Sequence, residues 1–196
     1  FNYQFVQGLP WAYNELIAPF DFAILKTNEE LNIETEQALN QLIPYYTYDV
    51  SLSDSMQQLV VDNFNEKWDL KYQNSAGPQR ALSFGVVSQL FTTVSNRGVL
   101  SVKDFYTGKE ELNILIGNKA NRVKTNSVYT LQAAQKHYQL VVEETNGIDK
   151  DLVLDVLQNN LFINLQFDTE TTTKDRSSIL SQLSLTKGLV QKGERI

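Results

Sequence analysis

The sequence predicts a helix-rich α+β fold with a small mixed sheet. Apolar residues recur at helical spacing over several long stretches, whereas stretches that alternate apolar and polar residues are fewer and shorter. The chain has 196 residues, of which 42% are hydrophobic and 11% aromatic, so it can bury a large core. We therefore expect residues 1–196 to form a single domain of one or two lobes.

The first elements are defined by clear start and stop signals. Residues 1–18 are aromatic and irregular, and the alternating residues 20–24 predict a strand. Thr27 and Glu30 form a capping-box pattern, which predicts a helix that runs from Thr27 until Pro44 stops it. Residues 45–50 predict a second extended segment.

Two longer helices follow, separated by a loop at residues 71–78. The first is expected to begin at Ser53 or Asp54 and to run to about Asp69. Its expected inward-facing residues are Met56, Leu59, Val60, Phe64 and Trp68. The second is expected over residues 79–95, with an apolar stripe of Leu82, Val86, Leu90 and Val94. Asn96-Arg97-Gly98 predicts its end, because glycine permits a left-handed turn.

The next stretch predicts a hairpin and two helices. Gly117-Asn118 is a hairpin-turn dipeptide between strands at residues 112–116 and 122–124. Ser127 is expected to cap a helix that runs to about Glu144. Asp149 is expected to cap a shorter helix, whose apolar residues are Val153, Val156 and Leu157.

An internal repeat relates residues 20–43 to residues 161–184. Each segment predicts a strand, a capped helix and an extended stretch, with Thr27 and Asp168 at equivalent N-cap positions. This pattern indicates a strand-helix pseudo-repeat. The alternative is a chance match between two amphipathic helices.

Composition excludes several classes of function. The formal net charge is -6 and Lys/Arg clusters are absent, which argues against binding to nucleic acid or to anionic membranes. The absence of cysteine excludes disulfides, thiolate nucleophiles and Cys-ligated metals. No stretch is long and apolar enough for a membrane span, and no signal peptide or initiator Met is present. The break within a strand near Ile196 favours a domain trimmed from a larger protein.

The chain offers little catalytic chemistry. His137 is the only histidine and has no Cys or second His partner, so we expect a structural or exposed residue. Paired carboxylates occur at Glu29-Glu30, Glu110-Glu111 and Glu143-Glu144. The first pair suits a helix N-terminus, and we expect the other two at the solvated surface. Because no phosphate-binding loop or nucleophile elbow is present either, we predict no catalytic, cofactor or metal site and no hydrolase activity.

Aromatic residues are the remaining candidates for a binding site. The cluster consists of Trp11, Tyr13, Phe20 and Phe22 with Tyr45, Tyr46 and Tyr48. We expect such a cluster to be core, with an interface or a ligand pocket as the alternative. Phe64 and Trp68, four residues apart on one helix face, are also expected in the core.

Several motifs together carry a family resemblance. They are Gly8-Leu9-Pro10-Trp11, Ala18-Pro19-Phe20-Asp21-Phe22, Pro44-Tyr45-Tyr46, Asn96-Arg97-Gly98-Val99-Leu100, Asn164-Leu165, Phe167-Asp168, Thr172, Arg176 and Gly188-Leu189-Val190-Gln191-Lys192-Gly193-Glu194. They resemble the extracytoplasmic domain of bacterial seven-transmembrane HD phosphohydrolases, in the form of Bacteroidetes-type bacteria. The terminal Lys-Gly-Glu stretch is the most specific of them, and the resemblance spans nearly the whole chain.

The resemblance implies a periplasmic domain, tethered to the inner membrane through flanking helices that are missing here. A separate cytoplasmic HD domain would hydrolyse a cyclic dinucleotide, cyclic di-AMP, and no catalytic residue of that domain lies in this chain. Two roles follow from the resemblance. One is a sensory or regulatory domain for an unidentified small molecule. The other is a structural or assembly module that forms a homodimer or docks an envelope protein.

These roles make different structural predictions. A buried pocket with unsatisfied polar groups would favour the sensor, and a large exposed apolar patch would favour docking. Insertion between two membrane helices further predicts that the segments near Phe20 and Val190 lie on one side of the domain, within one sheet.

Overall fold

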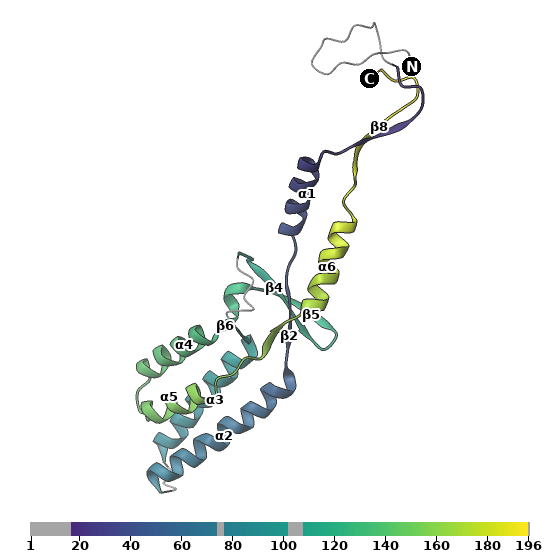
Figure 1. Ribbon diagram of the computed structural model, residues 1–196. Coiled ribbons are helices and arrows are strands. Elements are labelled where there is room, and N and C mark those ends of the chain that lie inside the picture. The colour runs from purple at the N-terminus through teal and green to yellow at the C-terminus, as the bar shows by residue number, and fades with distance from the viewer. Residues whose placement is uncertain (1–16, 74–76, 102–107, 196) are drawn as a thin grey trace. The chain divides into compact units, whose positions relative to one another are not determined.

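The protein is described by a computed structural model that covers residues 17–73, 77–101 and 108–195 (Figure 1). The expected helix-rich α+β fold is confirmed. The chain forms two compact units, and each is described separately below. One consists of residues up to Leu42 together with those from Asp175 onward, and the other of Ile43–Lys174.

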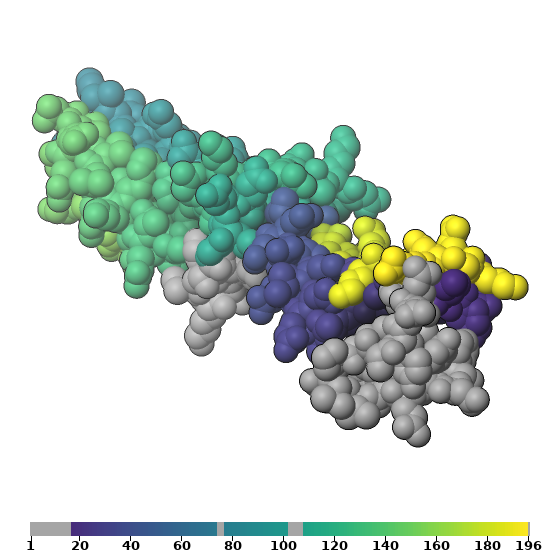
Figure 2. Space-filling model, turned by 90° about the horizontal axis from the view of Figure 1, so that it is seen from above, coloured from purple at the N-terminus to yellow at the C-terminus, as the bar shows by residue number. Residues whose placement is uncertain are grey.

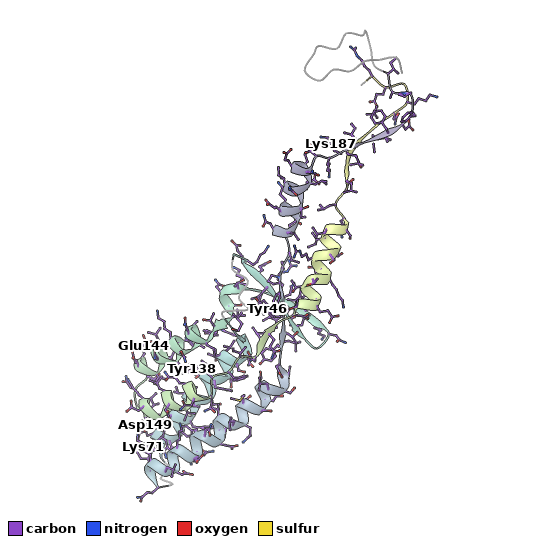
Figure 3. All side chains as sticks on the ribbon, viewed as in Figure 1. Tyr46, Lys71, Tyr138, Glu144, Asp149 and Lys187 are labelled. Atoms are coloured by element: carbon purple, nitrogen blue, oxygen red, sulfur yellow. The ribbon has the colours of Figure 1, made fainter. Side chains whose placement is uncertain are left out.

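Four helices form the main core of the Ile43–Lys174 unit: α2 (Val50–Tyr72), α3 (Pro78–Arg97), α4 (Leu131–Glu144) and α5 (Lys150–Asn159) (Figure 1). Their buried apolar residues make one continuous cluster, in which Phe64, Tyr138 and Val153 are fully buried. Figure 3 labels Tyr138 among these helices. Burial raises the pKa of the Tyr138 hydroxyl, so this group stays neutral in the core.

The expected inward faces of α2 and α3 are partly wrong. Val60, Phe64 and Trp68 are buried as predicted, but Leu59 is 43% exposed. On α3, Leu82 is 54% exposed. The buried face of α3 consists of Ser83, Val87, Leu90, Phe91, Val94 and Ser95. The expected stripe began one residue too early because a small polar residue, Ser83, lies in the core. Its hydroxyl oxygen accepts a hydrogen bond from the Asp149 N–H at 3.0 Å.

The same unit contains a mixed sheet of six strands. They are β2 (Tyr45–Tyr48), β3 (Val99–Leu100), β4 (Glu111–Ile116), β5 (Lys119–Lys124), β6 (Tyr129–Thr130) and β7 (Leu165–Phe167). Their order is β5-β4-β2-β7-β3-β6. The predicted hairpin is confirmed, since β4 and β5 pair antiparallel across Gly117. Tyr46, Leu100, Leu112, Ile114 and Leu165 form a second core cluster within this unit.

The start of α4 differs from the prediction. Thr125–Ser127 form a short 3-10 helix, and α4 is capped by the hydroxyl of Thr130, which accepts from the Ala133 N–H at 3.2 Å. Tyr129 and Thr130 instead form β6, which pairs parallel with β3. This pairing joins residues about thirty positions apart, so local cap signals could not reveal it.

Asn164 links the helices to the sheet. It is fully buried, and its Oδ1 accepts from the Val99 N–H at 2.7 Å. Its Nδ2 donates to the Ser53 hydroxyl at 3.0 Å and to the Ser95 carbonyl at 2.9 Å. A buried amide with all these partners fixes the register of α2, α3 and β3 at one point.

The other unit contains α1 (Asn28–Asn40) and an antiparallel ribbon of β1 (Phe22–Leu25) with β8 (Thr186–Val190). The predicted capping box of α1 is confirmed: the Thr27 hydroxyl accepts from the Glu30 N–H at 3.2 Å, and the Glu30 carboxylate accepts from the Thr27 N–H at 2.7 Å. Glu30 also pairs with Lys187 of β8 at 2.7 Å, and these bonds lower its pKa.

The internal repeat predicted from the sequence corresponds to matching helices. Helix α6 spans Thr169–Ser181 and α1 spans Asn28–Asn40, so both are 13 residues long and start and end 141 positions apart. Asp168 accepts from the Thr171 N–H at 2.8 Å and so caps α6 as Thr27 caps α1. Each copy begins with a strand, β1 or β7, and is followed in the chain by another strand, β2 or β8. β1 pairs with β8, and β2 pairs with β7.

Candidate functional site

The single histidine lies on α4, where it is half-buried. Its ring centroid is 5.5 Å from that of Tyr129. Within residues 17–73, 77–101 and 108–195, no group of three or more His, Cys, Asp or Glu side chains is placed to hold a metal ion. His137 therefore makes a ring contact at the surface of the helical core.

The three carboxylate pairs lie on separate elements. Glu29 is exposed in the first turn of α1, beside the capping residue Glu30. Glu111 begins β4, with its carboxylate 3.9 Å from Arg122 of β5. Glu143 and Glu144 are exposed in the last turn of α4. Glu110 and Glu111 line a hollow of about 520 Å³, whose other described lining residues, Lys109, Lys124, Thr125 and Asn126, are all polar or charged. This differs from the apolar pocket that raises the pKa of a general acid.

The predicted aromatic cluster does not form one site. Trp11 and Tyr13 lie outside the described residues. Phe20 is 62% exposed and packs edge-on against Phe22, with ring centroids 6.3 Å apart. Tyr46 is 1% exposed and packs on Phe167 in the sheet core. The tyrosines of β2 thus belong to one compact unit, and Phe20 and Phe22 belong to the other.

The β1–β8 ribbon brings the two ends of the described chain together (Figure 1, Figure 2). Phe22 is paired with Val190, which confirms that the segments near Phe20 and Val190 share one sheet. Pairing continues beyond the strands, because Ala18 donates its N–H to the Glu194 carbonyl at 2.9 Å. Ile17 and Arg195 form a further antiparallel bridge. None of the helices in the described part of the chain meets the length and apolarity needed to cross a membrane.

Large apolar side chains are exposed along this ribbon. Leu25 is 70% exposed, Leu189 is 59% exposed, and Leu185, just before β8, is 68% exposed. α1, in the same unit, has no buried residue among those described. A two-stranded ribbon is marginally stable by itself in water.

A cavity of about 370 Å³ lies between α2 and the start of α3. The residues that line it are Phe64, Asn65, Gly77, Arg80, Ala81 and Phe84. In the described part of the chain, Arg80 Nε is the one side-chain nitrogen or oxygen that is buried without a hydrogen-bond partner. The sequence did not reveal this site, because its two aromatic residues also fit an ordinary helical stripe and Arg80 follows a predicted loop.

Asp149 accepts hydrogen bonds from the side chains of Lys71 and Tyr72, and Figure 3 labels Asp149 and Lys71. Burial raises the pKa of Asp149, but hydrogen bonds from Lys71, from the Tyr72 hydroxyl and from the Leu152 N–H outweigh it, so the net shift is downward. The Leu152 bond caps α5, and the other two tie α5 to α2. All three hydrogen bonds to the Asp149 carboxylate therefore hold helices in place.

We expect Asp149→Asn to lower stability by about 1–2 kcal/mol at pH 7, since the amide keeps the cap but loses the charge opposite half-exposed Lys71. The lowered pKa of Asp149 contributes stability above the unfolded value near 4, and this contribution disappears as the pH falls through the folded value. Urea unfolding of both proteins at pH 7 and pH 3 should show a smaller difference in stability at pH 3 than at pH 7. A gap equal at both values would contradict the assignment, and Asp155→Asn, at a half-exposed carboxylate, is the control.

Comparisons with protein-family models, with curated protein sequences and with solved structures gave no match to this chain. The resemblance to the extracytoplasmic domain of HD phosphohydrolases therefore stays a prediction from the sequence motifs.

Proposed function

We propose that this chain is a non-catalytic sensory or regulatory domain on the periplasmic face of the bacterial inner membrane. In this proposal, a separate cytoplasmic HD domain of the same membrane protein hydrolyses cyclic di-AMP, and this chain controls its rate. The observation that carries the proposal is the antiparallel pairing of β1 with β8. An insertion between two membrane helices needs its two connections side by side, and this ribbon supplies them.

The ribbon also suggests how a signal would travel. Both connections belong to one hydrogen-bonded element, so a change in its pairing or tilt would act on both at once. Regulation requires an element with two states that a ligand and the HD domain can each bias. A short ribbon whose strands, β1 and β8, contain no buried residue can supply such an element at small energetic cost.

The alternative function is a structural or assembly module that forms a homodimer or docks an envelope protein. The exposed side chains of Leu25, Leu185 and Leu189 favour it, because large apolar side chains exposed on one ribbon are typical of an interaction surface. In this alternative the ribbon holds a partner, and its internal pairing has no effect on the HD domain.

A disulfide engineered across the ribbon would distinguish the sensory function from the docking function. Ala23 pairs with Leu189, and this chain has no cysteine of its own, so Ala23→Cys with Leu189→Cys introduces a single defined crosslink. In the full-length protein in membranes, we expect oxidised and reduced forms to differ by about fivefold or more in cyclic di-AMP hydrolysis. Oxidation should fix the ribbon in one of its two states.

The control is a crosslink in the other antiparallel ribbon, Leu115→Cys with Ala120→Cys across β4 and β5. It should leave the rate unchanged between the two redox states. Equal rates for the Ala23–Leu189 pair would refute the sensory function and favour the docking module.

A further inference from the structure

The cavity between α2 and α3 has the size and lining of a small-molecule site. Its volume of about 370 Å³ lies at the lower end of the range for ligand pockets. Half-buried Phe84 supplies its aromatic wall, and the fully buried Phe64 supports that ring from behind, with ring centroids 5.3 Å apart and planes inclined at 58°. Ala81 and Gly77 add little bulk, which leaves room for a flat apolar group against the Phe84 ring.

Arg80 is the charged residue of this cavity, and its guanidinium is only partly satisfied. Its Nη2 donates to Asn65 Oδ1 at 2.9 Å and lies 3.7 Å from Asp69 Oδ1. The Asp69 contact is long and both side chains are partly exposed, so it compensates the charge weakly. Arg80 Nε is buried and makes no hydrogen bond within the described residues. A buried N–H of a charged group is costly to leave unpaired, so it indicates a missing acceptor.

Asn65 provides a second donor in the same lining. Its Oδ1 is occupied by Arg80 Nη2, and this fixes the amide orientation so that Nδ2 remains as a donor. Two donors of this kind suit one carboxylate, whereas a phosphate needs a larger set of donors and charges. The aromatic wall suits an apolar body.

We propose that this cavity binds a small monocarboxylate with an aromatic body. The carboxylate accepts hydrogen bonds from Arg80 Nε and Asn65 Nδ2, and the ring packs against Phe84. This assignment gives the proposed sensor a ligand class, and its physiological use rests on that proposed function. Binding itself depends only on the cavity, so a binding measurement on the isolated chain tests it independently.

The test is isothermal titration calorimetry of the isolated chain with phenylacetate, 3-phenylpropionate and indole-3-acetate. We expect at least one of them to bind saturably at one site, with a Kd of about 1 mM or tighter, as suits ligands of this size. The matched amide, such as indole-3-acetamide for indole-3-acetate, should bind at least about tenfold more weakly because it lacks the charge. Absence of saturable binding by all three acids, or equal affinity for acid and amide, would overturn the proposal.

Two variants test the residues. Arg80→Gln should weaken binding by about tenfold or more, because it removes the unpaired Nε and the charge. Ala81→Leu keeps the charge but fills the cavity, and it should abolish binding. Arg122→Gln is the control, since Arg122 is exposed on β5 and does not line the cavity. Circular dichroism confirms that each variant is folded.

The outcomes separate this site from the proposed function. If an acid binds as expected while the ribbon crosslink leaves hydrolysis unchanged, the site stands and the sensory function fails. If Arg80→Gln or Ala81→Leu binds as tightly as the parent, the cavity is not the site. The ribbon experiment is unaffected by that result.

Discussion

Trp68→Ala is expected to lower the free energy of unfolding by about 3–5 kcal/mol, the usual cost of truncating a large buried aromatic residue. Trp68 is 3% exposed and lies between two other rings of α2. Its ring centroid is 5.7 Å from that of Phe64 and 4.4 Å from that of Tyr72. Removing the indole leaves a cavity that the rigid helices around it cannot close.

Urea unfolding followed by far-ultraviolet circular dichroism measures this effect without relying on tryptophan fluorescence. The matched control is Leu70→Ala on the same helix, where the side chain is 78% exposed. It should change stability by no more than about 0.5 kcal/mol. A Trp68→Ala protein as stable as the control would show that this face of α2 is not in the core.

Gly98→Ala should cost about 2–5 kcal/mol for two additive reasons. Gly98 ends α3 with φ at 89°, a conformation that is strained for any residue with a Cβ. A Cβ there would also lie 2.4 Å from Cδ1 and 2.7 Å from Cγ of Leu165. Leu165 is fully buried in the sheet core, so it cannot move aside without displacing its neighbours.

The same substitution at Gly85, in the middle of α3, should have the opposite sign. A Cβ there meets no described atom within 4 Å, and alanine favours the helix by about 0.5–1 kcal/mol over glycine. Thermal unfolding of the two variants should therefore move in opposite directions. A rise in the melting temperature of Gly98→Ala would contradict the strain and the clash at Gly98, and a fall for Gly85→Ala would contradict the open space at Gly85.

Features decided by nearby residues were predictable from the sequence. The caps Thr27, Asp149 and Asp168 each bind an N–H within the following turn, so their signal lies within four residues. Gly98 and Gly117 marked their turns for the same reason, since both adopt positive φ. The repeat could be predicted from the sequence because both copies have the same local order of N-cap residue and helix.

Features decided by distant pairing were not predictable. β3 and β6 have two residues each, and they exist because Val99 and Leu100 meet Tyr129 and Thr130. Burial of Leu59 and Leu82 was predicted wrongly, because which side of a helix faces inward depends on its neighbours. The cavity at Arg80 was likewise hidden, since it depends on how α2 and α3 pack.

The ribbon has a mechanical consequence. β1 enters and β8 leaves at the same end, with Ile17 opposite Arg195 there and Leu25 opposite Thr186 at the other end. A force that pulls Ile17 away from Arg195 would load the hydrogen bonds between the strands one after another. Breaking each bond costs only about 1 kcal/mol. The two strands would therefore separate at low force when their ends are pulled apart sideways. Opposite pulls on the two strands along the ribbon axis would load all of the bonds together.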